Sequence, residues 1–208
     1  ALTVGTNIAG TSGVTSSAGV TLRGANLTIA NGAKVTAGSN ADVVLAAAGN
    51  FVNSQGSDAV AVSGTGRWLI YSNAPGTDTF AGLDSANRAI WNATESSLAP
   101  ASLTATGNRY IFAYQPTLTV TTQDATKIYG DDAATDVAAA YAFSGLNAGV
   151  ANAYLADTAA DVYSGAPTVT STGSSKLAGV SGSPYAITAV QGALTVGDNY
   201  ALAFVNTG

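Results

Sequence analysis

The stretch "GVTLRGANLTIANGAKVTA" (residues 19–37) indicates the fold class, because apolar and polar residues alternate along it. Val20 and Leu22 lie two residues apart, and so do Leu27 and Ile29. Gly and Asn, which favour turns, separate the alternating runs. Alternation with a period of two is typical of short β-strands with one buried face, and it differs from the 3.6-residue stripe of an amphipathic helix. The stretch therefore predicts an all-β fold.

A longer repeat spans the first third of the chain. The triplets "VTL" (20–22), "VVL" (43–45) and "WLI" (68–70) recur at intervals of 23 and 25 residues, and "LTI" (27–29) and "FVN" (51–53) are 24 residues apart. A period in the twenties with several strands per period is typical of a β-solenoid, whose coils bury their apolar faces only by stacking. Strands of a sandwich with similar spacing remain the alternative.

We expect a short right-handed parallel β-solenoid over residues 1–72, an irregular cap or junction over 73–115 and a small β-sandwich over 116–208. The predicted solenoid core consists of the following apolar residues: Val20, Leu22, Leu27, Ile29, Val43, Leu45 and Phe51. In the junction, "NRYIFAYQP" (108–116) predicts a strand with Tyr110, Phe112 and Tyr114 on one face. The strands predicted after it lie within 117–122, 124–130, 140–146, 166–172, 184–196 and 199–205, and the Ala-rich segment 150–165 favours a helical turn.

The composition restricts the chemistry of the chain. Hydrophobic residues make up 47% of the 208 residues, whereas charged residues make up 9%, against roughly 25% in an ordinary soluble domain. Cys, Met and His are all absent, which excludes disulfides, haem, Cys/His zinc sites and Ser–His catalysis. The net charge of −5 and the scattered cations argue against nucleic acid and anionic membranes as partners. The absence of Cys and Met suits an extracellular protein that is exposed to oxidants. Chance in a small Ala/Thr/Gly-rich chain explains this absence nearly as well.

The acidic residues offer two candidate chemistries. Asp131, Asp132 and Asp136 follow Asp124 in a turn-rich stretch, and oxygen ligands of this kind bind Ca²⁺. The stretch lacks the spacing of a calcium loop, so a solvated loop is the simpler interpretation and we predict no cofactor. The other acidic candidates are Asp78, Asp84 and Glu95, which lie near the aromatic residues of the junction. A glycosidase needs two carboxylates in one cleft, and nothing in the sequence brings these residues together in one. We therefore predict that the protein is not an enzyme.

Aromatic residues gather around the junction, among them Trp68, Trp91 and Tyr114. Their rings are suited to stacking on sugars, which makes a polysaccharide a candidate partner. The competing interpretation is that they cap the open end of the solenoid, and we favour it. Arg67 precedes Trp68 and is expected to lie over a ring or to bind backbone carbonyls.

The segments "GRWLIYSNAPGTDTFAGL" (66–83), "QPTLTVTTQDATKIYGD" (115–131) and "GSPYAITAVQGALTVGDNYALAFV" (182–205), in this order, resemble the distal part of filamentous-haemagglutinin-like adhesins. In that family, a parallel β-helix leads through an irregular module into β domains of the MBG type. The resemblance implies a repetitive adhesive or matrix protein that is exported by two-partner secretion, through an outer-membrane exporter, to the surface of a Gram-negative bacterium. It supplies no catalytic residues, and the secretion domain of the family is not in this sequence.

The two ends of the chain suggest how it assembles. The MBG-like unit stops at "FVNTG" (204–208), where the family pattern continues with a strand such as "GTLTV", and the chain opens with "ALTVGTN" (1–7). We expect head-to-tail contact by donor-strand complementation, in which an N-terminal strand completes a neighbouring β domain in an extracellular filament or biofilm matrix fibre. A covalent tandem array and an arbitrary segment boundary remain alternatives. A carbohydrate-binding adhesin segment is the alternative function. The expected contact residues are Ala1, Leu2, Thr3, Val4, Ala203, Phe204, Val205 and Asn206.

Overall fold

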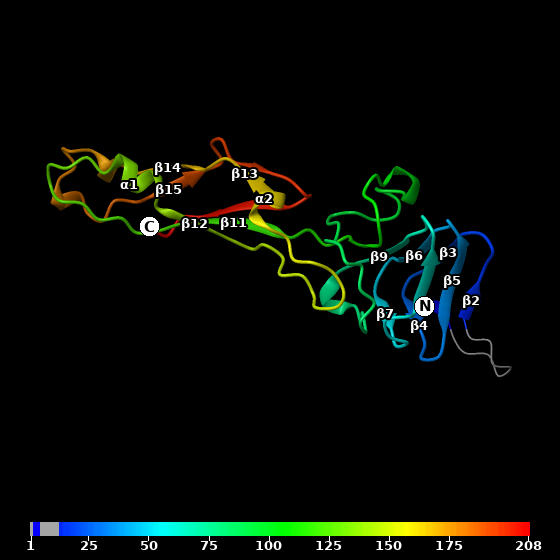
Figure 1. The fold of residues 1–208 in the computed structure, drawn as a ribbon. Coiled ribbons are helices and arrows are strands. Elements are labelled where there is room, and N and C mark those ends of the chain that lie inside the picture. Colours follow the sequence, from blue (N-terminus) through cyan, green and yellow to red (C-terminus); the bar gives the residue numbers. More distant parts are fainter. Residues whose placement is uncertain (1, 5–12) are drawn as a thin grey trace. The chain divides into compact units, whose positions relative to one another are not determined.

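The computed structural model describes residues 2–4 and 13–208, which form mainly short β-strands (Figure 1). Ala1, one of the expected contact residues, lies outside the described residues. The chain divides into two compact units. Unit 1 contains Ala1–Gln115 and Asn147–Asp157, and unit 2 contains Pro116–Leu146 and Thr158–Gly208. A short segment from the second half of the sequence therefore belongs to the first unit.

Unit 1 contains three parallel sheets, and each sheet takes one strand from each successive repeat. Their strand orders are β1-β4-β7, β2-β5-β8 and β10-β9-β6-β3. The strands are β1 (Leu2–Val4), β2 (Gly13–Thr15), β3 (Val20–Gly24), β4 (Leu27–Ile29), β5 (Lys34–Ser39), β6 (Val43–Ala47), β7 (Phe51–Asn53), β8 (Val60–Ser63), β9 (Trp68–Ser72) and β10 (Arg109–Phe112). Two 3₁₀ turns complete the unit, η1 (Pro75–Thr77) and η2 (Pro100–Ser102).

The repeat of about two dozen residues corresponds to the pairing register. Leu22 pairs with Leu45, which pairs with Ile70, so the equivalent residues of successive repeats stack on one another. Leu27 pairs with Phe51 in the same way on a second sheet. The predicted core residues are buried except Leu22, which is only partly buried. The reason is its position, because β3 is the last strand of its sheet among the described strands.

Polar side chains at the corners bind the backbone of the next repeat. Asn26 Oδ1 accepts a hydrogen bond from the Asn50 N–H over 2.8 Å, and Asp42 Oδ1 accepts one from the Arg67 N–H over 2.9 Å. Asn40 has a positive φ of 61°, and its Oδ1 accepts from the backbone N–H of Thr65. Backbone donors that leave the sheets at the corners are thereby satisfied, as buried or half-buried polar groups require.

Unit 2 is built from smaller sheets. Its strands are β11 (Thr117–Thr122), β12 (Tyr141–Ser144), β13 (Tyr163–Ser164), β14 (Thr168–Thr170), β15 (Thr188–Val190), β16 (Thr195–Val196) and β17 (Ala201–Val205). β11 lies between the antiparallel β12 and the parallel β17, whereas β13-β16 and β14-β15 are two-stranded antiparallel pairs. The short helices and 3₁₀ turns are α1 (Ala134–Ala138), α2 (Ala159–Val162), η3 (Thr172–Ser174) and η4 (Val180–Gly182). Val120, Val137, Val169, Ile187 and Leu194 contribute to one core cluster.

Two local expectations for unit 2 are wrong and one is confirmed. Residues 124–130 form no strand, and none of the described strands pairs with their backbone. Helix α1 was not expected, and its Val137 packs into the core of unit 2. The helical turn expected within 150–165 is α2, which has a capping box formed by Thr158 and Asp161. Within the described residues, no helix has the length and apolar character needed to cross a membrane.

Candidate functional site

The aromatic residues of the junction form one buried cluster in unit 1. Tyr110 lies at its centre, with its ring centroid 5.0 Å from that of Trp68 and 6.1 Å from that of Phe112. Trp91 stacks on Phe112 at 5.2 Å, and Tyr154 lies edge-on to Trp91 at 6.0 Å. Burial raises the pKa of Tyr154 to about 12 and raises the pKa of Tyr110 further, so both phenols are neutral at physiological pH.

Burial removes most of the predicted glycan-stacking surface. Trp68 is 2% exposed and Trp91 is 1% exposed, whereas Tyr114 is 47% exposed. A sugar needs an open ring face, so the two Trp residues are not accessible to one, and of the three only Tyr114 has accessible area. The cluster instead covers the last repeat of unit 1, where β10 pairs with β9. The cap interpretation of the aromatic residues therefore fits the burial better than the stacking interpretation.

The segment 147–157 packs against this cluster through Tyr154 and Asp157. Sequence analysis did not predict that this segment belongs to unit 1. Asp157, which is 7% exposed, accepts a hydrogen bond through Oδ2 from the indole Nε1 of Trp91 over 2.7 Å. Its Oδ1 lies 3.7 Å from the Arg88 guanidinium, and Arg88 forms a parallel bridge with Leu155. Nothing in the local sequence around Asp157 indicates a partner more than sixty residues away, so only the tertiary fold reveals this contact.

Arg67 binds backbone carbonyls, which is one of its two expected roles. Its guanidinium donates to the carbonyls of Pro100 (3.2 Å) and Leu103 (3.1 Å) and to that of Ala105. Its Nε also lies 3.5 Å from the Asp42 carboxylate. Arg67 therefore holds the irregular segment after η1 against the stacked sheets, which is a structural role.

The proposed calcium ligands do not converge. No group of three or more acidic side chains with metal-binding geometry occurs in the described part of the chain. Asp132 lies just before helix α1, and its Oδ1 accepts a hydrogen bond from the Ala134 N–H over 2.9 Å. The Lys127 ammonium lies in the same acidic region, where it donates to the carbonyl oxygens of Asp131 (3.3 Å) and Ser175. Asp136 stands in the first turn of α1. The region is a loop in which the Lys127 ammonium binds backbone carbonyl oxygens.

The acidic residues of the junction have separate structural partners. Glu95 receives a bidentate pair of hydrogen bonds from Arg23, each 2.7 Å long. Asp84 Oδ1 accepts from the Ala86 N–H. Asp78 Oδ1 accepts from the Phe51 N–H and its Oδ2 accepts from the Ser72 hydroxyl. Burial raises the pKa of Asp78 to about 6, although both hydrogen bonds oppose that rise.

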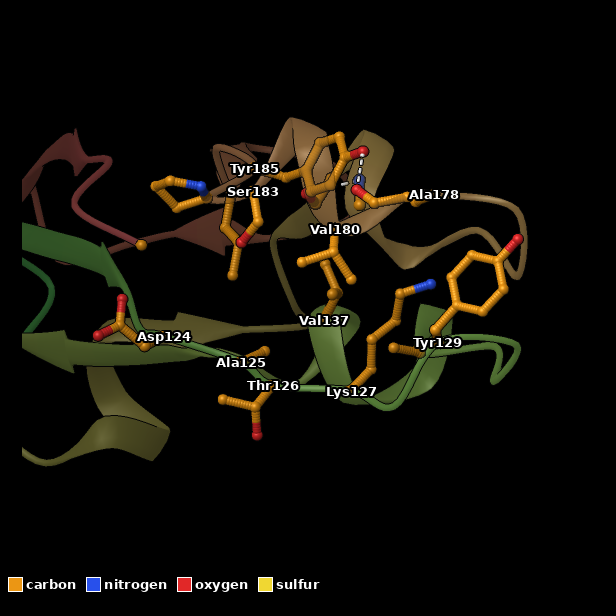
Figure 2. Close-up of a pocket in the computed structure, with 17 residues that line it drawn as sticks. Asp124, Ala125, Thr126, Lys127, Tyr129, Val137, Ala178, Val180, Ser183 and Tyr185 are labelled. Atoms are coloured by element: carbon orange, nitrogen blue, oxygen red, sulfur yellow. Dashed lines mark hydrogen bonds between the residues drawn. The ribbon is translucent and has the colours of Figure 1, made fainter.

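A pocket of about 500 Å³ opens in unit 2 (Figure 2). Figure 2 shows the segment 124–127 along one side of the opening and Ser183 and Tyr185 along the other, with Val137 and Val180 between them. Tyr185 is fixed in place, because its hydroxyl donates to the Gly179 carbonyl. Its ring lies so close to Gly173 that a side chain there would meet it at 2.7 Å. The lining is mixed, because apolar residues alternate around it with the polar or charged side chains of Asp124, Thr126, Lys127, Ser171 and Ser183.

The residues that follow β17 lead to the wall of this pocket, which Gly208 helps to line. The Thr207 N–H and the Gly208 N–H both donate to the Thr122 hydroxyl, and the Ile187 N–H donates to the Gly208 carbonyl over 2.9 Å. Asn206 Oδ1 accepts from the Ala189 N–H. The chain therefore passes between β11 and the start of β15, and Gly208 lies in the pocket wall.

The expected contact residues that the structure describes lie on two edge strands, except Asn206, which follows β17. β1 is the outermost strand of its sheet among those described, with Val4 buried and Thr3 exposed. β17, which carries Ala203, Phe204 and Val205, is outermost in the sheet β12-β11-β17. Phe204 is partly buried against the core of unit 2, and Val205 is 42% exposed. The structure pairs β1 with β4 of its own chain.

Comparisons of the chain with protein-family models, with curated protein sequences and with solved structures found no match.

Proposed function

We propose that this chain is part of an extracellular structural or adhesive protein that assembles head to tail, with the N-terminal strand of one copy completing the β unit of the next. In this proposal unit 1 is a short right-handed β-solenoid of the filamentous-haemagglutinin-like kind, and unit 2 is an MBG-like domain. The in-register stacking of repeats 23–25 residues apart supports the first assignment. The protein is secreted to the surface of a Gram-negative bacterium through an outer-membrane exporter and has no enzymatic activity.

The observation that carries the proposal is that β1 is the outermost strand of its sheet among the described strands. The Leu2 N–H donates to the Asn26 carbonyl, and the Val4 carbonyl accepts from the Ala30 N–H, so Leu2 and Val4 direct their backbone groups towards β4. Backbone groups alternate between the two edges of a strand, so the N–H and C=O of Thr3 face outward. An exposed edge of this kind is a template for pairing with another chain.

Unit 2 offers the complementary end. β17 uses one edge to pair with β11, as shown by the 2.9 Å hydrogen bond from the Ala201 N–H to the Pro116 carbonyl. The contact between unit 1 of one copy and unit 2 of another joins two different surfaces, and contacts of this type propagate instead of closing. The low charge content favours such association, because little electrostatic repulsion opposes it.

The test compares the variants Thr3→Pro and Thr3→Ala. Proline removes only the outward N–H of β1 and is tolerated on edge strands, whereas alanine keeps that N–H. Sedimentation velocity and negative-stain electron microscopy then measure assembly over a range of protein concentrations. We expect wild-type protein and Thr3→Ala to form linear oligomers and Thr3→Pro to stay monomeric with an unchanged circular dichroism spectrum. A wild-type protein that stays monomeric at high concentration, or a Thr3→Pro variant that polymerises normally, contradicts the proposal.

A further inference from the structure

We propose that Asn31 in unit 1 is a site of spontaneous covalent modification. Its side chain deamidates through a cyclic imide formed with the Gly32 backbone, and Gln55 of the next repeat sets the rate. Asn31 and Gly32 form the one Asn-Gly dipeptide of the sequence. They lie in the turn between β4 and β5, and both are exposed. The proposal does not depend on the head-to-tail assembly proposed above.

The turn presents the two reacting groups to water and to each other. The Ala33 N–H donates to the Ala30 carbonyl over 3.0 Å, so residues 30–33 form a closed β-turn. Gly32 has a φ of 80°, a conformation that favours glycine. Because glycine has no Cβ, no side chain hinders the approach of its nitrogen to Cγ of Asn31. Asn31 is exposed, so water reaches the same carbon.

The reaction needs only these two residues and water. The Gly32 nitrogen attacks Cγ of Asn31, and the new C–N bond closes a five-membered succinimide ring. The side-chain amide nitrogen leaves as ammonia and takes the proton of the Gly32 N–H with it. Water then opens the ring at one of its two carbonyl carbons. Opening at one carbon gives aspartate at position 31, and opening at the other gives isoaspartate, whose main chain is longer by one methylene group.

Gln55 restrains the attacking nitrogen. Its Oε1 accepts a hydrogen bond from the Gly32 N–H, from a position 23 residues further along the chain. Its Nε2 donates to Asp58 Oδ1 over 3.0 Å, and the Asp58 carboxylate pairs with the Lys34 ammonium. Lys34 is the first residue of β5, so these contacts hold Gln55 beside the turn. The Gly32 N–H must leave Gln55 before its nitrogen reaches Cγ of Asn31, and we infer that this slows the reaction.

The modification changes the connection between two sheets. β4 belongs to the sheet β1-β4-β7 and β5 to the sheet β2-β5-β8, so the turn 30–33 joins two sheets of one repeat. Both products place a carboxylate in this turn. Isoaspartate also lengthens the main chain between Ala30 and Ala33, whose hydrogen bond closes the turn. We therefore expect modified protein to unfold at a lower urea concentration than unmodified protein.

The test incubates the full-length protein at mildly alkaline pH, folded or in concentrated urea, and follows each Asn-containing peptide by mass spectrometry. We expect Asn31 to convert in the folded protein, but more slowly than in urea. Asn92 is the internal control, because it is exposed but precedes Ala93, whose N–H donates to a backbone carbonyl. Gln55→Ala should speed the conversion of Asn31 about two- to tenfold, the effect of one hydrogen bond. Asp58→Ala removes only a support of Gln55 and should have a smaller effect.

The outcomes separate the site from the residue that controls it. If Asn31 stays unmodified in the folded protein while it converts in urea, or if Asn92 converts as fast as Asn31, the site assignment is overturned. If Gln55→Ala converts Asn31 at the wild-type rate, the role of Gln55 is overturned. If this variant speeds Asn31 and Asn92 alike, it acts by loosening the whole unit, which overturns that role as well. Acceleration at Asn31 alone, with an unchanged circular dichroism spectrum, supports both parts of the proposal.

Discussion

The two units of this protein bury their apolar residues to different extents. Of the largest fully buried side chains in the described part of the chain, only Leu118 and Leu194 belong to unit 2. Unit 2 instead exposes Ile128 and Leu177, which are 76% and 84% accessible. In unit 1, each strand pairs in parallel with the equivalent strand of the next repeat. The strands between the ends of a sheet therefore have neighbours on both sides, which bury their apolar side chains. Unit 2 has two- and three-stranded sheets, and its loops extend beyond them.

This difference in burial and backbone pairing indicates which surface of each unit is available for function. A stack with paired backbone and a buried aromatic cap resists change, and among its described strands unpaired edges occur only at the ends of the sheets. A unit with free backbone and exposed apolar loops has surface available for a partner. Both tryptophans belong to unit 1, so tryptophan fluorescence reports on that unit alone and allows the comparison to be tested.

The largest expected effect is that of Trp91→Ala in the aromatic cap. The substitution leaves a cavity beside Phe112 and removes the hydrogen bond to buried Asp157, so we expect a loss of about 3–5 kcal/mol in the free energy of unfolding of unit 1. Urea denaturation followed by Trp68 fluorescence measures it. Trp91→Phe keeps the ring and should lose about 1–3 kcal/mol through Asp157. A loss below 1 kcal/mol for Trp91→Ala would show that the cap does not stabilise the stack.

A smaller effect is expected from Leu45→Ala, with Leu22→Ala as the matched substitution one repeat earlier. Leu45 is 0% exposed between two paired strands, so its truncation should cost about 2–5 kcal/mol. Leu22 stacks on Leu45 at the end of the sheet and is partly exposed, so we expect about half that cost. Chemical denaturation of both variants provides the comparison. Equal losses at the two positions would contradict the positional argument.

The smallest effect is a pH dependence that belongs to unit 1. The pKa of Asp78 in the folded protein is about 6, above its ordinary value of 3.8, so the folded state favours the protonated carboxyl. Its contribution is fully present below pH 3.8 and is lost as the pH rises through 6, which lowers the free energy of unfolding by about 1–2 kcal/mol after allowance for partial solvent exposure.

Asp78→Asn removes this dependence while retaining an oxygen acceptor for the Phe51 N–H. Unfolding of both proteins, followed by tryptophan fluorescence at pH 4, 5, 6 and 7, measures the difference between the two curves. A difference that does not change with pH, or one that changes with the opposite sign, contradicts the assignment to Asp78.

The features that repeat could be predicted from the amino-acid sequence. The triplets "VTL", "VVL" and "WLI" predict strands that stack, and the structure pairs Leu22, Leu45 and Ile70 in that register. Alternation also located β10, with Tyr110 and Phe112 buried on one face. These predictions succeed because a strand with a buried face requires alternating side chains, and a stacked coil requires the same residues at the same position in each repeat.

The features that depend on distant partners could be read only from the folded structure. It assigned the segment 147–157 to unit 1, where Asp157 bonds to Trp91, and it left the segment 124–130 without the strand that its sequence predicts. The physical reason is the same in both cases. A buried carboxylate is stable only beside a donor, and an extended segment becomes a strand only beside another strand. A local sequence pattern indicates which secondary structure or contact a residue favours. The fold determines which distant residue lies close enough to form that contact.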